Sequence, residues 1–238
     1  MKTKAICIIP ARGGSKRIPK KNIKAFLGKP LIAYSIEVAK RSRLFEKIVV
    51  STDDATIAKV AMEYGAKVPF MRPQELSDDH TSSGDAVTHA LEFLQKQGEQ
   101  YDYLCTIYAT APLLQEKYLK EGLLKLQANP DAHLAFSVTS MPFPIQRTFK
   151  ITKDGRCEMF WPENFHKRSQ DLEEAYQDAG QFYWQNLHNQ PTDIPFGKSS
   201  IAVVLPRYLV QDIDTPEDWK MAEVLYTVVQ QQKGSDHV

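Results

Sequence analysis

Apolar runs alternate with helical apolar periodicities along the first seventy residues of the chain. Residues 5–9 form an apolar run that predicts a buried strand, and the run ends at Pro10, which cannot donate a ladder hydrogen bond. The alternation continues downstream, with helices expected at residues 31–39 and 57–64 and strands at residues 48–50 and 67–70. Strands that alternate with helices in this way predict a parallel sheet with right-handed crossovers.

The later part of the chain repeats the same kinds of pattern. Further helices are expected at residues 85–97 and 119–126, and further strands at residues 101–107, 133–138, 201–205 and 209–214. A last helix begins with Thr215 as its N-cap and Pro216 at its first position. The sequence therefore predicts a single α/β domain over residues 1–238, with a Rossmann-like, mostly parallel sheet flanked by helices.

Residues 141–185 depart from this pattern. The segment is rich in aromatic residues, is interrupted by Pro142, Pro144 and Pro162, and has no clear periodicity. We interpret it as an excursion from the sheet that supplies part of a substrate pocket and a subunit contact, and we expect a homodimer. The alternative is that these aromatic side chains fill the core of the domain itself.

Composition narrows the classes of function. The chain is 42% hydrophobic and carries a net charge of +1, so it has a sizeable core and no global field that favours nucleic acid or a membrane surface. No apolar run reaches the roughly 18 residues of a membrane span, and the first residues do not resemble a signal peptide. The three cysteines show no metal-ligand spacing, and Cys7 and Cys105 lie in predicted strands, which fits a reducing cytoplasm.

The loop after the first strand has the chemistry of an anion site. Gly13 and Gly14 allow backbone N–H groups to turn toward a ligand, and five cations lie nearby: Arg12, Lys16, Arg17, Lys20 and Lys21. A donor-rich cationic loop that follows a strand suits a triphosphate. The loop matches neither the Walker A spacing nor G-x-G-x-x-G. The alternative is a surface loop with solvated lysines.

Two carboxylates near the C-terminus complement this loop. Asp212 and Asp214 flank Ile213 in a predicted strand, so both face the same side, and a Mg²⁺ ion would relieve their mutual repulsion. Alternatively, Asp214 caps the last helix and Asp212 is a solvated residue. Because ligands of open parallel sheets bind at the carboxyl ends of strands, the loop and the acid pair together predict nucleotidyl transfer. No general base stands out, since His80 and His166 lie in polar segments where solvated histidines are common.

The stretch P-A-R-G-G-S-K-R-I-P-K-K-N, residues 10–22, resembles the signature loop of the cytidylyltransferases that activate sialic-acid-like sugars as CMP conjugates. These enzymes share the nucleotide-diphospho-sugar transferase type of fold. The resemblance implies that CTP and its triphosphate are held by a set of nine residues: Ala11, Arg12, Gly13, Gly14, Ser15, Lys21, Asn22, Arg72 and Ser83. It places the metal ligands at Asp212 and Asp214, and gives catalytic roles to Arg12, Lys21, Arg168 and Asp212.

The sugar side of the resemblance rests on two further segments. The family's R-x-Q-D box appears at residues 168–171, and its Q-x-T-S-P-L-R stretch appears here as Y-A-T-A-P-L-L, residues 108–114. The resemblance therefore implies that the substrate is contacted by Tyr108, Thr110, Arg168, Gln170 and Gln181. Taken alone, Arg168 reads equally well as a surface cation.

The departures at residues 108–114 remove hydrogen-bond donors from the region that faces the sugar in the family, so a less polar sugar would fit. Together with D-A-G-Q-F-Y-W at residues 178–184, they make the chain resemble the subgroup that acts on pseudaminic acid. The reaction so implied joins CTP to this nonulosonic acid and releases pyrophosphate. The alternatives are the same reaction on N-acetylneuraminic, legionaminic or Kdo-type acids, and a nucleotide-binding protein without catalysis.

Overall fold

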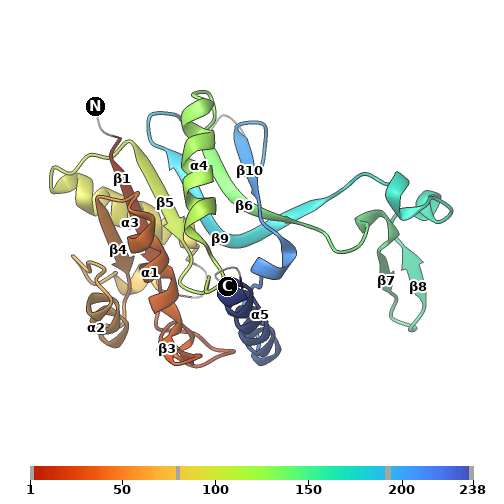
Figure 1. Ribbon diagram of the computed structural model, residues 1–238, viewed down its shortest axis with the longest axis horizontal. Helices are drawn as coiled ribbons and strands as arrows, with labels where there is room; N and C mark the ends of the chain where they lie inside the picture. Colours follow the sequence, from red (N-terminus) through yellow and green to blue (C-terminus); the bar gives the residue numbers. More distant parts are fainter. Residues whose placement is uncertain (1–2, 79–80, 191–193, 236–238) are drawn as a thin grey trace.

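A six-stranded sheet forms the centre of the computed structural model, which describes residues 3–78, 81–190 and 194–235. The order of its strands is β10-β6-β9-β5-β1-β4 (Figure 1). Their bounds are β1 Ala5–Pro10, β4 Lys47–Ser51, β5 Tyr103–Ile107, β6 Leu134–Ser140, β9 Tyr176–Asn186 and β10 Ser200–Val204. β9 pairs antiparallel with both of its neighbours, and the other pairs are parallel. The predicted mostly parallel α/β sheet is thus confirmed.

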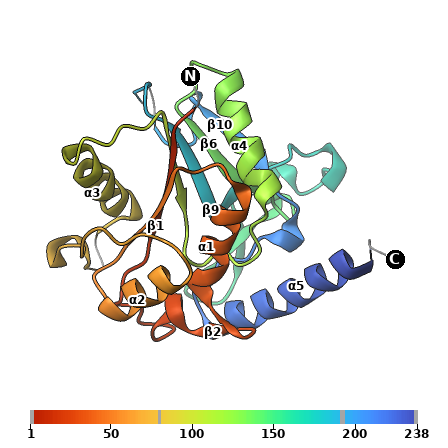
Figure 2. The ribbon, with the colours of Figure 1, turned by 60° about the vertical axis from the view of Figure 1, so that its left-hand side comes forward.

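Helices cover both faces of this sheet (Figure 2). The helices are α1 Leu31–Ser42, α2 Ala55–Glu63, α3 Ser83–Lys96, α4 Glu116–Ala128 and α5 Pro216–Ser235. Side chains of α1 and α4 pack with Cys7 and Ile9 of β1, whereas α3 packs with Ile6 and Ile8 on the opposite face. Because β1 is buried on both faces, its sequence is continuously apolar rather than alternating.

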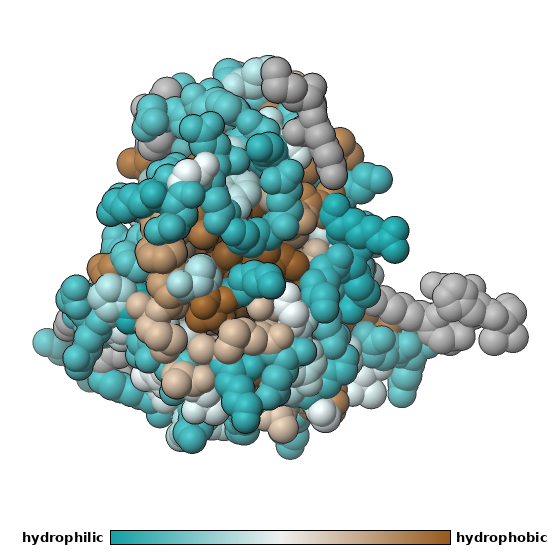
Figure 3. All heavy atoms as spheres, turned by 90° about the vertical axis from the view of Figure 1, so that its left-hand side faces the viewer, coloured by the Kyte–Doolittle hydropathy of each residue, from teal (hydrophilic) through white to brown (hydrophobic). Residues whose placement is uncertain are grey.

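The face shown in Figure 3 is largely hydrophilic, and apolar side chains gather in a hollow near its centre. None of the helices within the described residues is long and apolar enough to cross a membrane.

A separate apolar cluster fixes the segment that carries the acid pair. Phe26 of the short strand β2 (Ala25–Phe26), which pairs with β3 (Lys29–Pro30), packs edge to face on Tyr34 and on Trp219 of α5. Ile213 is fully buried in the same cluster. Thr215 and Asp218 form a reciprocal cap at the start of α5, which confirms the predicted helix start. The acid pair is therefore anchored at Ile213 and at the helix cap.

Two predicted strands do not form. Residues 67–70 make only a single parallel bridge, between Lys67 and Val49, because Pro69 ends the pairing. Of residues 209–214, Leu209 ends a 3₁₀ turn, η6 Arg207–Leu209, and residues 210–214 follow it as irregular chain. Side chains satisfy their carbonyls in place of a ladder: Gln181 Nε2 donates to Leu209 O at 2.5 Å, and Lys21 Nζ donates to Ile213 O at 2.5 Å.

An arm extends from the ends of β6 and β9, away from the body of the molecule (Figure 1). It contains a hairpin of β7 Phe149–Ile151 and β8 Cys157–Met159, and three 3₁₀ turns, η3 Ile145–Arg147, η4 Pro162–Asn164 and η5 Ser169–Asp171. Its exposed aromatic side chains are Phe143, Phe149, Phe160, Trp161 and Phe165.

The excursion ends earlier than the predicted residue 185, because β9 returns to the sheet at Tyr176. Phe182 and Trp184 of β9 are fully buried in the core of the domain. Trp184 stacks on Phe45 and its indole N–H donates to Leu119 O at 3.0 Å. For these two residues the alternative, that the aromatic side chains fill the domain's own core, is the correct one.

Candidate active site

A cationic cavity of about 490 Å³ opens at the carboxyl ends of β1 and β5. Six of the nine predicted nucleotide residues line it: Arg12, Ser15, Lys21, Asn22, Arg72 and Ser83. Tyr108 and Thr110, predicted to contact the second substrate, line it as well. Parts of the chain that are far apart in sequence thus meet where open α/β sheets bind ligands.

The remaining three predicted residues shape the loop. The Ala11 N–H donates to Ser51 O at 2.9 Å, and the Gly13 N–H donates to Asp53 Oδ1 at 2.9 Å. A Cβ added at Gly13 would lie 3.0 Å from the side chain of Asp54, the N-cap of α2, so this close approach favours glycine there. Gly14 is exposed. Ala11 and Gly13 therefore hold the loop against the end of β4 and the turn that leads into α2.

Arg72 is a buried cation at the wall of this cavity. Its Nε and Nη2 atoms make no hydrogen bond within the described chain, and Nη2 lies 3.6 Å from Asp53 Oδ1. Burial lowers the pKa of the guanidinium, and the charge of Asp53 partly offsets that effect. Unpaired buried donors are costly, so Arg72 is suited to a ligand that brings acceptor atoms.

The acid pair, Asp212 and Asp214, borders a second cavity, of about 670 Å³, which Arg17 and Tyr108 also line. Although residues 209–214 are not a strand, Ile213 is buried and both neighbouring carboxylates line this cavity, as the alternation predicts. Asp212 is exposed, but the walls of the cavity desolvate its carboxyl and raise its pKa, and the charge of Asp214 raises it further. The charges of Lys21 and Arg17 offset part of this rise in the pKa.

This donor set fits Mg²⁺. Among the described residues, no group of three or more histidine, cysteine, aspartate or glutamate side chains could hold a metal ion. Two carboxylates are nevertheless what Mg²⁺ commonly uses, since waters and substrate phosphates fill its other positions. The raised pKa of Asp212 means that its ionised carboxylate is disfavoured in the folded protein, and a cation bound there would favour the ionised form.

Asp212→Asn is expected to raise the melting temperature at pH 7.5 in EDTA by no more than about 1 °C, because Asp212 is exposed and water screens its charge. The pKa of Asp212 is raised in the folded protein, so its ionised form opposes folding above that pKa, and the difference shrinks as the pH falls toward about 4. With millimolar Mg²⁺ the order of the two melting temperatures should reverse, because only the wild type binds the ion. Thermal unfolding at both pH values, with and without Mg²⁺, measures this. An equal response of both proteins to Mg²⁺ would contradict the assignment.

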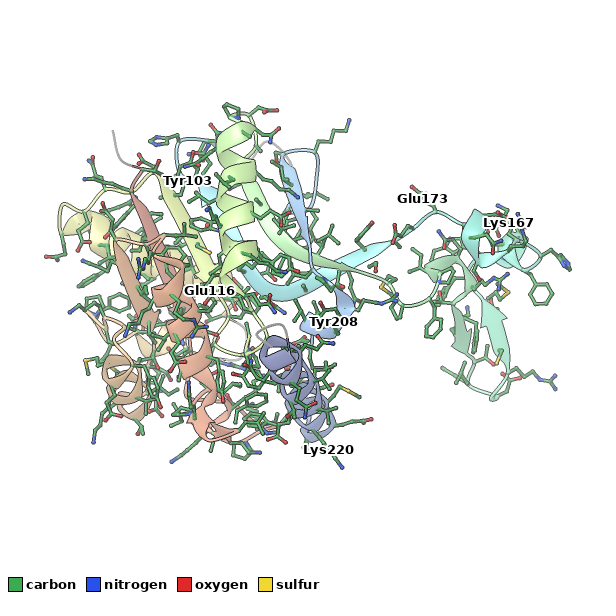
Figure 4. The ribbon with its side chains drawn as sticks, in the orientation of Figure 1. Tyr103, Glu116, Lys167, Glu173, Tyr208 and Lys220 are labelled. Carbon is green, nitrogen blue, oxygen red and sulfur yellow. The ribbon has the colours of Figure 1, made fainter. Side chains whose placement is uncertain are left out.

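Three predicted substrate residues do not reach either cavity of their own chain. Gln181 is buried in the core, where its amide supports Leu209 O. Arg168 and Gln170 lie in the arm, close to the labelled Lys167 and Glu173 (Figure 4). There the Arg168 guanidinium pairs with Asp171 at 2.7 Å. The arm also holds His166, against Phe165, whereas His80 lies outside the described residues.

Sequence reasoning missed Tyr183 and Asp178. The Tyr183 hydroxyl donates to Asp178 Oδ2 at 2.6 Å, and its ring lies 5.3 Å from that of Tyr108. The pKa of Tyr183 is raised, and burial of the side chain is the largest cause. The pair forms because β9 bulges between Asp178 and Tyr183, with Gly180 at a φ of 60°. The sequence offered one signal for this bulge, because Gly180 interrupts a strand pattern.

A third cavity, of about 430 Å³, is mainly apolar and lies beside the other two. Leu104, Leu134 and Phe196 line it, together with Tyr108 and Tyr183. Tyr108 borders all three cavities, so it stands where the cationic, acidic and apolar spaces meet. This arrangement can hold a polyanion, a metal ion and a partly apolar second substrate around one point.

Comparison with known proteins agrees with this geometry. Residues 6–230 match the cytidylyltransferase family. A pseudaminic acid cytidylyltransferase of Campylobacter jejuni is 50% identical over 226 residues, which cover 94% of this chain and 97% of that protein. A CMP-N,N'-diacetyllegionaminic acid synthase of Legionella pneumophila is 30% identical over 241 residues, covering 95% and 97%.

The fold has a solved counterpart in a CMP:2-keto-3-deoxy-manno-octonic acid synthetase complexed with CTP. The TM-score is 0.66 at 18% identity, and the alignment covers 96% of this chain and all of that one. The family match over residues 6–230 and the identity to full-length relatives lead to one conclusion: this chain belongs to the cytidylyltransferase family and is a CTP-dependent nucleotidyltransferase.

Proposed function

We propose that this enzyme transfers the cytidylyl group of CTP to the anomeric hydroxyl of pseudaminic acid, giving the CMP-sugar and pyrophosphate. The observation that carries the proposal is the meeting of three cavities at Tyr108. The 50% identity to the Campylobacter jejuni pseudaminic acid cytidylyltransferase supports the choice of sugar.

The cationic cavity suits the nucleotide. Arg12 and Lys21 would neutralise the triphosphate, because guanidinium and ammonium donors bind phosphate oxygens strongly. The unpaired N–H groups of Arg72 suit cytosine, whose O2 and N3 both accept hydrogen bonds, whereas N3 of uracil is a donor. This chemistry would favour CTP over UTP.

The acidic cavity suits the reacting centre. The oxygen of the anomeric hydroxyl attacks the α-phosphorus and its proton passes to solvent, while the bond from the α-phosphorus to the bridging oxygen breaks and pyrophosphate leaves with that oxygen. Mg²⁺ held by Asp212 and Asp214 would neutralise charge on the phosphate as the reaction proceeds. Positioning by the loop and charge neutralisation are the main requirements of such a transfer, and the site supplies both.

The apolar cavity suits the sugar. Pseudaminic acid lacks the C9 hydroxyl and carries amides at C5 and C7, so it offers apolar groups where a sialic acid offers hydroxyls. Tyr108, Leu134 and Phe196 form a wall that favours such groups. N-acetylneuraminic, legionaminic and Kdo-type acids remain alternatives for this same site.

Pyrophosphate release with CTP and Mg²⁺ tests the reaction. We expect release to require both CTP and pseudaminic acid, and to fall by about tenfold or more when UTP replaces CTP. Absence of release with every nonulosonic acid would favour the remaining alternative, a nucleotide-binding protein without catalysis.

We further propose that the enzyme is a homodimer held together by the arm. The arm exposes Phe143, Phe149 and Phe165 to solvent, an unusual apolar surface for a monomer. A twofold dimer would bury this surface and would carry Arg168 of each arm toward the sugar pocket of the partner. Sedimentation at micromolar concentration that shows only monomer would contradict this.

The buried free thiols Cys7 and Cys105 fit a reducing compartment, so we place the enzyme in the cytoplasm.

A further inference from the structure

Both carboxylate oxygens of Asp214 are engaged by cations of the N-terminal loop. Arg17 Nη2 lies 2.8 Å from Asp214 Oδ2, and Lys21 Nζ lies 3.2 Å from Oδ1. These contacts join loop residues to a carboxylate nearly 200 positions away in the sequence. Asp214 is one of the two carboxylates that fit Mg²⁺, so cations of the chain occupy the oxygens that the ion would use.

The two cations differ in their freedom to move. Lys21 is mostly buried, with 19% of its side chain exposed, and it also donates to Ile213 O at 2.5 Å. Arg17 has 65% of its side chain exposed, and within the described residues its ion pair is with Asp214. Arg17 lines both the cationic and the acidic cavity, so it lies between the place of the triphosphate and the place of the metal. Arg17 is therefore the cation that can change partners.

We infer that Arg17 is a nucleotide-binding residue that exchanges partners, leaving Asp214 for the polyphosphate when CTP binds. The inference rests on the proposed function. A guanidinium binds phosphate oxygens bidentately, and a triphosphate offers it more charge than one carboxylate does. Once Arg17 has moved, an oxygen of Asp214 becomes available to a divalent cation. CTP and the metal then each strengthen the binding of the other, since such coupling is reciprocal.

Binding of Mn²⁺ in the absence of nucleotide, followed by electron paramagnetic resonance of the free ion, tests this directly. Arg17→Gln removes the competing cation, so it should bind Mn²⁺ about five- to tenfold more tightly than the wild type. Lys20→Gln is the matched control. Lys20 is an exposed cation of the same loop, and its substitution removes the same charge as Arg17→Gln does. It should change Mn²⁺ affinity by less than about twofold.

The same variants are then titrated with CTP in EDTA by calorimetry. Arg17→Gln should weaken CTP binding by about tenfold, while Lys20→Gln should change it much less. Opposite shifts for metal and nucleotide are the signature of exchange, whereas damage to the fold would weaken both. Arg17→Lys, which keeps the charge, should stay within about threefold of the wild type for Mn²⁺ and serves if the glutamine variant is unstable.

Unchanged or weaker Mn²⁺ binding by Arg17→Gln, or unchanged CTP binding, would overturn the inference. Neither measurement needs sugar or turnover. Failure of the exchange is therefore distinguishable from failure of the proposed reaction, which pyrophosphate release reports separately.

Discussion

Asp212→Ala is expected to lower kcat by about 10²–10³-fold, while the KM for CTP stays within a few-fold of the wild type. Asp212 lies beside Asp214 in the acidic cavity and does not line the cationic cavity that would hold most of the triphosphate. Its loss removes half of the metal's protein ligands, and metal stabilisation of the transferring phosphate contributes several kcal/mol. The larger effect should therefore fall on the chemical step, and the coupling between metal and CTP adds only the smaller change in KM.

Steady-state pyrophosphate release over a range of Mg²⁺ concentrations measures this change. The matched control is Glu217→Gln, which removes an exposed carboxylate from the first turn of α5, next to but outside the acidic cavity. It should keep nearly full activity. A variant at Asp212 that retains wild-type activity and Mg²⁺ dependence would show that the metal binds elsewhere.

Co-expression of Arg168→Ala with Asp212→Ala is expected to restore activity that neither variant has alone. We expect Arg168→Ala by itself to lose about 100-fold, since it removes a charged contact to the reacting substrate. In a mixed dimer, the Arg168→Ala chain keeps its own acid pair and receives an intact arm from its partner. Half of the dimers are mixed and each has one intact site, so about a quarter of wild-type activity should return.

The matched control pairs Asp212→Ala with Arg12→Ala, because both changes lie in the body of the chain. A mixed dimer of these two has no intact site and should stay inactive. Recovery in both pairs, or in neither while dimers form, would contradict the placement of Arg168 at the partner's sugar pocket.

Local sequence patterns predicted those parts of the site that lie at the end of a single strand or at the start of a single helix. The apolar run before Pro10 and the loop cations predicted the cationic cavity, and Thr215 and Pro216 predicted the start of α5. The family match confirmed the resemblance seen in residues 10–22. The loop cations and the helix start each depend on side chains that are near one another in the sequence, whereas the far wall of the cationic cavity comes from distant residues such as Arg72 and Tyr108.

Features that depend on distant partners could not be predicted in this way. Residues 209–214 have a strand-like pattern, but Lys21 and Gln181 bind their carbonyls and no strand lies alongside. Gln181 faces the core because β9 bulges, which places Tyr183 and Asp178 at the cavity. The ion pair of Arg17 with Asp214 depends on packing of α5, which no local pattern reveals.

The most direct test of the central claim is a competition between two sugars in one vessel. The enzyme receives limiting CTP, Mg²⁺ and equal concentrations of pseudaminic acid and N-acetylneuraminic acid, and the two CMP-sugars are counted by mass spectrometry. The apolar wall at Tyr108 and Phe196 predicts that the pseudaminic acid product exceeds the other by about tenfold or more. An excess of CMP-N-acetylneuraminic acid would keep the nucleotidyl transfer but contradict the proposed substrate.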